Sequence, residues 1–180
     1  GGGGGGGLGG EVAWLGAERG ANVVVADRDH EAAKKGAEEA RAVAGKESGL
    51  AVAVDIRRRD AIRQSLRDLV AAYGGLDVLI NTAALFPSSN DGQISDEQWG
   101  VTLDVNVTAN YLLADEAGRI LRDQNLNASM VLTSSANAVV PKRGSEAYDV
   151  SKAALSHLVR ELTISLSPKI RVHGISPATV

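Results

Sequence analysis

A tyrosine and a lysine lie four residues apart in the segment "YDVSK", as Tyr148 and Lys152. Apolar residues recur at helical spacing through the following "AALSHLVRELTISLS", which predicts that the pair shares one face of a helix. A neighbouring ammonium group lowers the pKa of a tyrosine from its ordinary value of about 10. Such a pair can donate and accept a proton near neutral pH. The alternative is a solvent-exposed pair on an amphipathic helix.

Two further features are typical of a dinucleotide site. The chain opens "GGGGGGGLGGEVAWLG", a glycine-rich stretch that leads directly into a predicted helix. Glycines allow the backbone to approach a pyrophosphate closely, and a helix N-terminus offers N–H donors to it. Asp27 ends the predicted strand 22–27, about 18 residues after Gly9, where a ribose-binding acid is expected. A flexible glycine tail and a helix-initiating acid are the respective alternatives.

The composition argues against several classes of protein. The 180 residues are enough for one domain with a full core, and 44% of them are hydrophobic. A net charge of −3 gives no electrostatic reason to expect nucleic acid or an anionic membrane as a partner. Three histidines and no cysteine leave little for a transition metal, so no metal is expected. No apolar run reaches the length of a membrane span and no signal peptide is visible, so we expect a cytoplasmic protein.

The elements that must position these residues alternate between short apolar runs and longer amphipathic stretches. This pattern predicts an α/β fold with a doubly wound, Rossmann-like parallel sheet that is covered on both faces. Residues 1–180 form one dinucleotide-binding domain, in which the strand before the glycine turn and a C-terminal segment are expected to be missing. The predicted helices are 29–45, 57–75, 95–124 with a bend near Gly100, and the helix of Tyr148. The predicted strands are 22–27, 50–55, 76–81, 128–135 and 169–176.

With these motifs in order over nearly the whole chain, the sequence resembles the short-chain dehydrogenase/reductase family. The Y-x-x-x-K pair of the family is Tyr148 and Lys152. Its strand-end serine precedes the tyrosine by 13 residues, which selects Ser135 over Ser134. Its N-V-x-G motif appears at 106–109, with Asn106 in the place of the catalytic asparagine. Taken alone, Asn106 is open to reading as a helix-kink residue and Ser135 as a turn residue, but the joint occurrence favours an active site.

The same resemblance assigns residues to the cofactor. The family has a glycine turn, T-G-x-x-x-G-I-G, in whose first position this chain has Gly2. It also has an acid after the third strand, an N-N-A-G motif and a P-G turn. Besides Tyr148 and Lys152, the implied cofactor residues are Gly3, Gly7, Leu8, Gly9, Asp27, Arg28, Asp55, Ile56, Asn81, Ala83 and Pro177. The chain departs from the family pattern at Thr82, Ala84, Ala109, His173 and Ala178, which affects loop geometry more than chemistry.

The resemblance implies an oxidoreductase that transfers a hydride between nicotinamide and a small alcohol, aldehyde or ketone. Tyr148 would be the acid/base, and Lys152 would lower its pKa and bind the nicotinamide ribose. Ser135 would hold the substrate oxygen, and Asn106 would bind a water molecule that relays protons. Asp27 implies NAD, because the 2′-phosphate of NADP would place a second negative charge beside it.

Alternatives and finer assignments stay open at this point. The competing hypothesis is a non-catalytic dinucleotide-binding or oligomerisation module. Segments such as "INTAALFPSS" also resemble the dehydrogenase half of bifunctional rhamnulose-phosphate aldolase/lactaldehyde dehydrogenase proteins, which implies lactaldehyde as substrate and a preceding aldolase domain. The family resemblance further implies a homodimer or homotetramer built through the two long helices. The apolar residues that support this assembly are Leu112, Leu113, Leu158 and Val159.

Overall fold

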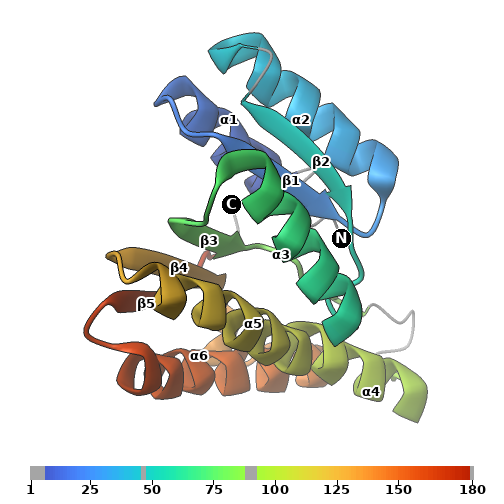
Figure 1. Ribbon diagram of the computed structural model, residues 1–180. Coiled ribbons are helices and arrows are strands. Elements are labelled where there is room, and N and C mark those ends of the chain that lie inside the picture. Colours follow the sequence, from blue (N-terminus) through green and yellow to red (C-terminus); the bar gives the residue numbers. More distant parts are fainter. Residues whose placement is uncertain (1–6, 46–47, 88–92, 179–180) are drawn as a thin grey trace.

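The computed structural model describes residues 7–45, 48–87 and 93–178, and its helices and strands alternate along the chain as predicted (Figure 1). Gly3, a predicted cofactor residue, lies outside these ranges. None of the helices within them is both long and apolar enough to cross a membrane. The elements are α1 (Gly7–Glu18), β1 (Val23–Asp27), α2 (His30–Ala44), β2 (Gly49–Ala53), α3 (Arg59–Tyr73), β3 (Val78–Asn81), α4 (Asp96–Leu103), the π-helix η1 (Asp104–Thr108), α5 (Ala109–Gln124), β4 (Ala128–Thr133), the 3₁₀ helix η2 (Ala136–Ala138), α6 (Glu146–Leu166) and β5 (Ile170–Ile175).

The strands form two parallel sheets, in the orders β1–β2 and β3–β4–β5. In the second sheet Asn81 is in register with Leu132, and Thr133 with Ile175, so the carboxyl ends of its three strands meet at one edge. Within the described ranges no strand pairs with the second edge of β1 or of β3. The α/β, Rossmann-like fold is therefore confirmed. The expected single sheet is divided in two, because no described segment supplies a strand between β1 and β3.

The helices form layers on both sides of the strands. α1 and α2 lie side by side against β1 and β2, and α3 lies on the opposite side of β2 (Figure 1). α5 and α6 pack against the β3–β4–β5 sheet, where Leu121, Met130, Leu132 and Leu155 are buried in one hydrophobic core. Both faces of the sheet were predicted to be covered by helices, but the face of β3 opposite α5 and α6 is partly exposed. The Val78 side chain remains 53% exposed there.

Local sequence signals begin and end the helices where they were expected. Asp29 caps α2 by accepting hydrogen bonds from two backbone N–H groups, and Gly45 follows its last turn. Ser95 and Gln98 form the predicted capping box of α4. The predicted helix 95–124 is continuous from α4 through η1 to α5, and the bend expected near Gly100 stays a prediction. The irregularity is the π-turn at Asp104–Thr108, a feature that often marks a functional site.

An ion-pair network joins α3 to α5. The Arg59 guanidinium contacts both Asp115 and Glu116, and Arg63 contacts the second carboxylate oxygen of Glu116. Glu116 is buried, so its charge has to be compensated by these partners. Because α3 also contacts β2, the network connects the half of the molecule that carries Asp27 with the half that carries Tyr148.

Candidate active site

Three hydrogen bonds fasten the carboxyl end of β4 to α6. The Lys152 Nζ donates to the main-chain oxygen of Thr133 over 2.7 Å. The Ser134 hydroxyl bonds the main-chain oxygen of Lys152 at 3.0 Å and the Ser156 hydroxyl at 2.6 Å. These contacts use Ser134 as a structural residue, and the choice of its neighbour Ser135 as the catalytic serine stays a prediction.

Lys152 is the largest side chain that the described core buries, with 1% of its surface exposed. Its Nζ lies 5.4 Å from the centroid of the Tyr148 ring, so the predicted pair does meet on one side of the helix. Burial lowers the pKa of Lys152 from its ordinary value of 10.5 to about 8. At pH 7 the side chain is thus still charged, and the ammonium faces an aromatic ring rather than water.

Ser135 follows β4 and begins η2, the short helix that packs against α6. Its side chain is buried, and its Oγ accepts a hydrogen bond of 3.2 Å from the Asn137 N–H. The next backbone N–H, that of Ala136, donates to the Pro177 carbonyl over 3.0 Å. Ser135 and Pro177 therefore lie at the same edge of the sheet as the Lys152 contact.

Asn106 lies in the π-turn and is completely buried. Its amide Nδ2 donates to the Leu85 carbonyl (2.9 Å) and to the Ser151 hydroxyl (2.9 Å), and its Oδ1 accepts from the Leu85 N–H (2.7 Å). Both amide hydrogens are thus committed to the protein. In this structure the amide is a clamp between the segment after β3 and α6, and the water-relay role stays a prediction.

Asn110 is a site residue that the sequence analysis missed. It is buried one helical turn after Asn106, and its Nδ2 donates to the Asn106 main-chain oxygen over 3.0 Å. Its Oδ1 accepts a 2.7 Å hydrogen bond from the amide of Asn81, whose own Oδ1 accepts from the Ala83 N–H. The signal in the sequence was a second asparagine four residues after Asn106 in the same predicted helix.

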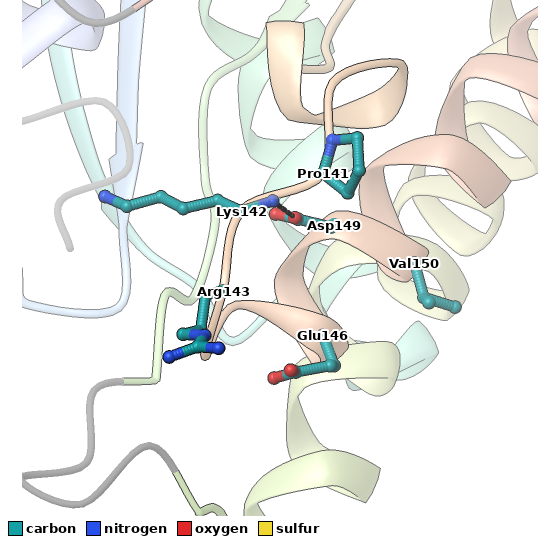
Figure 2. A pocket seen from close by; sticks show the side chains of 6 residues that line it. All are labelled: Pro141, Lys142, Arg143, Glu146, Asp149 and Val150. Atoms are coloured by element: carbon teal, nitrogen blue, oxygen red, sulfur yellow. Dashed lines mark hydrogen bonds between the residues drawn. The ribbon is translucent and has the colours of Figure 1, made fainter.

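Asp149, also missed, holds the loop between Ser135 and Tyr148. Its buried carboxylate accepts hydrogen bonds of 2.7 Å each from Asn137, the Ser145 hydroxyl and the Lys142 N–H. Burial raises the pKa of this carboxyl, but the three donors outweigh it and the pKa lies below its ordinary value. A 420 Å³ cavity beside this carboxylate is lined by Pro141, Lys142, Arg143, Glu146, Asp149 and Val150, and does not include Tyr148 (Figure 2).

The predicted cofactor residues between Gly7 and Ile56 lie on α1, at the end of β1 and after β2. Gly7, Leu8 and Gly9 form the first turn of α1, where backbone N–H groups lack intrahelical partners. Asp27 ends β1, is 7% exposed, and accepts a 3.0 Å hydrogen bond from the Asp29 N–H. Asp55 follows β2 with Ile56 and is paired with Arg57; that contact, together with a weaker effect of Arg28, lowers the pKa of Asp55 to about 2.

The chain is similar to known proteins both in sequence and in overall structure. The sequence profile described as "Enoyl-(Acyl carrier protein) reductase" matches residues 3–180. A crystal structure of a short-chain type dehydrogenase/reductase from Mycobacterium marinum has 31% sequence identity, covers 96% of this chain and 70% of its own, and superimposes with a TM-score of 0.89. The chain belongs to the short-chain dehydrogenase/reductase family. A second solved structure, described as NAD⁺-bound xylitol dehydrogenase, has 26% identity and a TM-score of 0.90 over 97% of this chain and 66% of its own.

One curated relative is much longer than this chain. The uncharacterized oxidoreductase YuxG of Bacillus subtilis is 33% identical over 179 residues, which is 99% of this chain but 26% of that protein. The chain thus spans about a quarter of this relative. Membership identifies the chain as part of an oxidoreductase of this family.

The residues present fit the nicotinamide dinucleotide that the family uses. The first turn of α1 offers unpaired N–H groups, and Asp27 ends β1 as a nearly buried acceptor. Gly9, a predicted pyrophosphate contact, is buried in that first turn. In the catalytic half, Lys152 and Tyr148 lie beside the carboxyl ends of the strands, where ligands bind in α/β folds.

The burial of Lys152 leads to a prediction about stability. Between pH 8 and 10.5 the unfolded chain binds a proton at this lysine that the folded protein does not, so the free energy of unfolding should rise with pH in this window. Over that pH range the free energy of unfolding of the wild type should increase, relative to that of Lys152→Met, by up to about 3 kcal/mol. Urea denaturation at several pH values measures this difference.

The matched control for this prediction is Lys35→Met, which removes an exposed lysine on α2. The control should follow the pH dependence of the wild type. A Lys152→Met variant that shows the same pH dependence as the wild type would contradict the burial of a charged lysine.

Proposed function

We propose that this protein transfers a hydride between NAD(H) and a small alcohol or carbonyl substrate, with Tyr148 as the acid/base. The observation that carries the proposal is the buried Lys152 ammonium facing the Tyr148 ring at the strand end that also carries Ser135. A binding module would have no use for a buried charge at this place, since burial of an ammonium is costly.

Each residue then has a defined task. When bound, the nicotinamide supplies the acceptor or donor of the hydride. Tyr148 gives its phenolic proton to the substrate oxygen during reduction, or accepts it during oxidation. The ammonium of Lys152 stabilises the negative charge that develops on the phenol oxygen, and the Ser135 hydroxyl donates a hydrogen bond to the substrate oxygen.

The first test of the function is the substitution Tyr148→Phe. It removes only the proton-transferring hydroxyl, so turnover should fall by at least about a hundredfold while NADH affinity stays nearly unchanged. Lys152→Met should lower turnover and also weaken NADH binding, because the ammonium would stabilise the phenolate and bind the nicotinamide ribose. Steady-state NADH absorbance and fluorescence titration of NADH measure the two quantities. Near wild-type turnover in Tyr148→Phe would refute the assignment.

The preference for NAD rests on Asp27. Its nearly buried carboxylate ends β1, where the adenosine ribose of the dinucleotide is expected, and it would accept hydrogen bonds from the ribose hydroxyls. The exposed Arg28 acts on Asp55, so its charge is directed partly toward another carboxylate. A 2′-phosphate would bring like charges together beside Asp27, at a cost of about 1–3 kcal/mol.

Asp27→Ala should therefore move the cofactor preference toward NADP by roughly ten- to a hundredfold. The measurement is the ratio of kcat/KM for NAD and NADP in the wild type and the variant. Asp29→Ala, which removes the helix cap two residues later, is the matched control and should keep the ratio. A wild type that prefers NADP, or an unchanged ratio in Asp27→Ala, would exclude this role.

Assembly through α5 and α6 is part of the proposal. Leu112, Leu113, Leu158 and Val159, the residues expected at the contact surface, are partly buried against the core, and their part in the assembly stays a prediction. The large apolar side chains that are exposed on these two helices are Tyr111, Val150 and Ile164. Their exposure favours a homodimer or homotetramer that covers them.

Light scattering of the full chain should accordingly give a dimer or tetramer at micromolar concentration. Ile164→Asp should shift the mass toward the monomer, because it places a charge on an apolar surface that is covered in the assembly. The exposed Leu126, which lies outside both helices, provides the control Leu126→Asp. A monomeric wild type would speak against the assembly. The bifunctional aldolase/lactaldehyde dehydrogenase assignment, lactaldehyde as substrate and the cytoplasmic location stay predictions.

A further inference from the structure

Phe86 is an aromatic residue that the catalytic scheme does not use. It follows β3 on the loop at the carboxyl edge of the sheet, and half of its surface, 50%, is exposed. Its ring centroid lies 4.7 Å from that of Tyr148, with 65° between the ring planes. This is an edge-to-face arrangement, which aromatic pairs prefer. A large exposed phenylalanine in direct contact with the acid/base residue requires an explanation beyond core packing.

The position of Phe86 is set by its neighbour on the chain. Leu85 exchanges two hydrogen bonds with the buried amide of Asn106, one through its N–H and one through its carbonyl. A backbone segment that is held at both groups has little freedom to move. Phe86 is therefore presented to Tyr148 by a rigid loop end.

The backbone of Tyr148 is connected to the Asn106 amide through Ser151. The Ser151 hydroxyl donates to the Tyr148 main-chain oxygen over 2.7 Å and accepts from the Asn106 amide. Asn106 thus contacts both the residue before Phe86 and the helical turn that carries Tyr148. Phe86 and Tyr148 are therefore linked in two ways. Their rings are in direct contact, and hydrogen bonds connect their backbones through Leu85, Asn106 and Ser151.

We propose that Phe86 is a positioning and specificity-determining residue for the Tyr148 reaction. Its edge-to-face contact limits the orientations of the phenol, and its exposed face forms an apolar wall of the site beside the reacting oxygen. The wall favours substrates whose substituent on that side is a small alkyl group. It disfavours a hydroxylated substituent there, since that group would lose water without gaining a partner. This inference rests on the proposed function, and deepens it to a substrate class.

The kinetic test uses three variants of Phe86 with 2-propanol, 2-butanol, 2-pentanol and 1,2-propanediol as probes. Phe86→Tyr keeps the ring and should retain both kcat and selectivity. Phe86→Leu keeps an apolar wall without the ring, so kcat should fall about three- to tenfold while the preference for 2-butanol over 1,2-propanediol remains. Phe86→Ala loses both, and this preference should fall by about tenfold or more. Leu126→Ala, at the opposite end of β4, is the control with unchanged kinetics.

A second readout does not depend on turnover. The chain has three tyrosines, so the ring-proton NMR signals of Tyr148 can be assigned by comparison with Tyr148→Phe. The ring-current shift that Phe86 causes on Tyr148 should vanish in Phe86→Ala and Phe86→Leu and persist in Phe86→Tyr. The inference would be overturned if the Tyr148 signals did not change in Phe86→Ala, or if an active Phe86→Ala enzyme kept the kcat and the selectivity of the wild type. Either result would leave the proposed function intact. A wild type without turnover on every alcohol and its carbonyl product would overturn the proposed function, and with it the role of Phe86 in specificity.

Discussion

The burial of the Lys152 ammonium is the constraint on which the catalytic half of this molecule depends. A charge taken out of water must be compensated, and the compensation here is a hydrogen bond to the Thr133 carbonyl together with the face of the Tyr148 ring. Both partners are needed at the same place. The end of β4 and the first turns of α6 are consequently held together, and Ser135 is carried to the site by the strand end that follows.

The π-turn at Asp104–Thr108 serves the same site from the other side. It places Asn106 where its amide reaches both Leu85 and Ser151, and Asn110 where it reaches Asn81. A buried amide that loses a partner costs free energy, so these contacts are mutually dependent. The segment after β3, the long helix and α6 therefore behave as one unit around Tyr148.

In the described residues the two halves of the molecule are connected by helix packing rather than by strand pairing. Ile62 and Leu66 of α3 are buried in the same hydrophobic core as Leu121 of α5, and ion pairs join the same two helices. β1 and β2 form their own sheet, and α3 bridges it to α5 through Arg59, Arg63 and the buried Glu116. Buried and multiply paired carboxylates are sensitive to the loss of any one partner. The relative placement of the Asp27 end and the Tyr148 end thus depends on this network and on the hydrophobic core that α3 shares with α5.

The sequence by itself determined the identity and order of the elements, because their signals are local. Alternating apolar runs, the cap at Asp29, the capping box at Ser95 and Gln98, and the spacing of Tyr148 and Lys152 each depend on residues a few positions apart. Only the tertiary structure decided which residues meet. Lys152 bonds Thr133, Asn106 bonds Leu85, Asp149 bonds Asn137, and the ring of Phe86 contacts that of Tyr148. These partners are 12 to 62 residues apart in sequence. No periodicity or motif records such pairs, since they arise from the packing of loops and helices at one edge of a sheet.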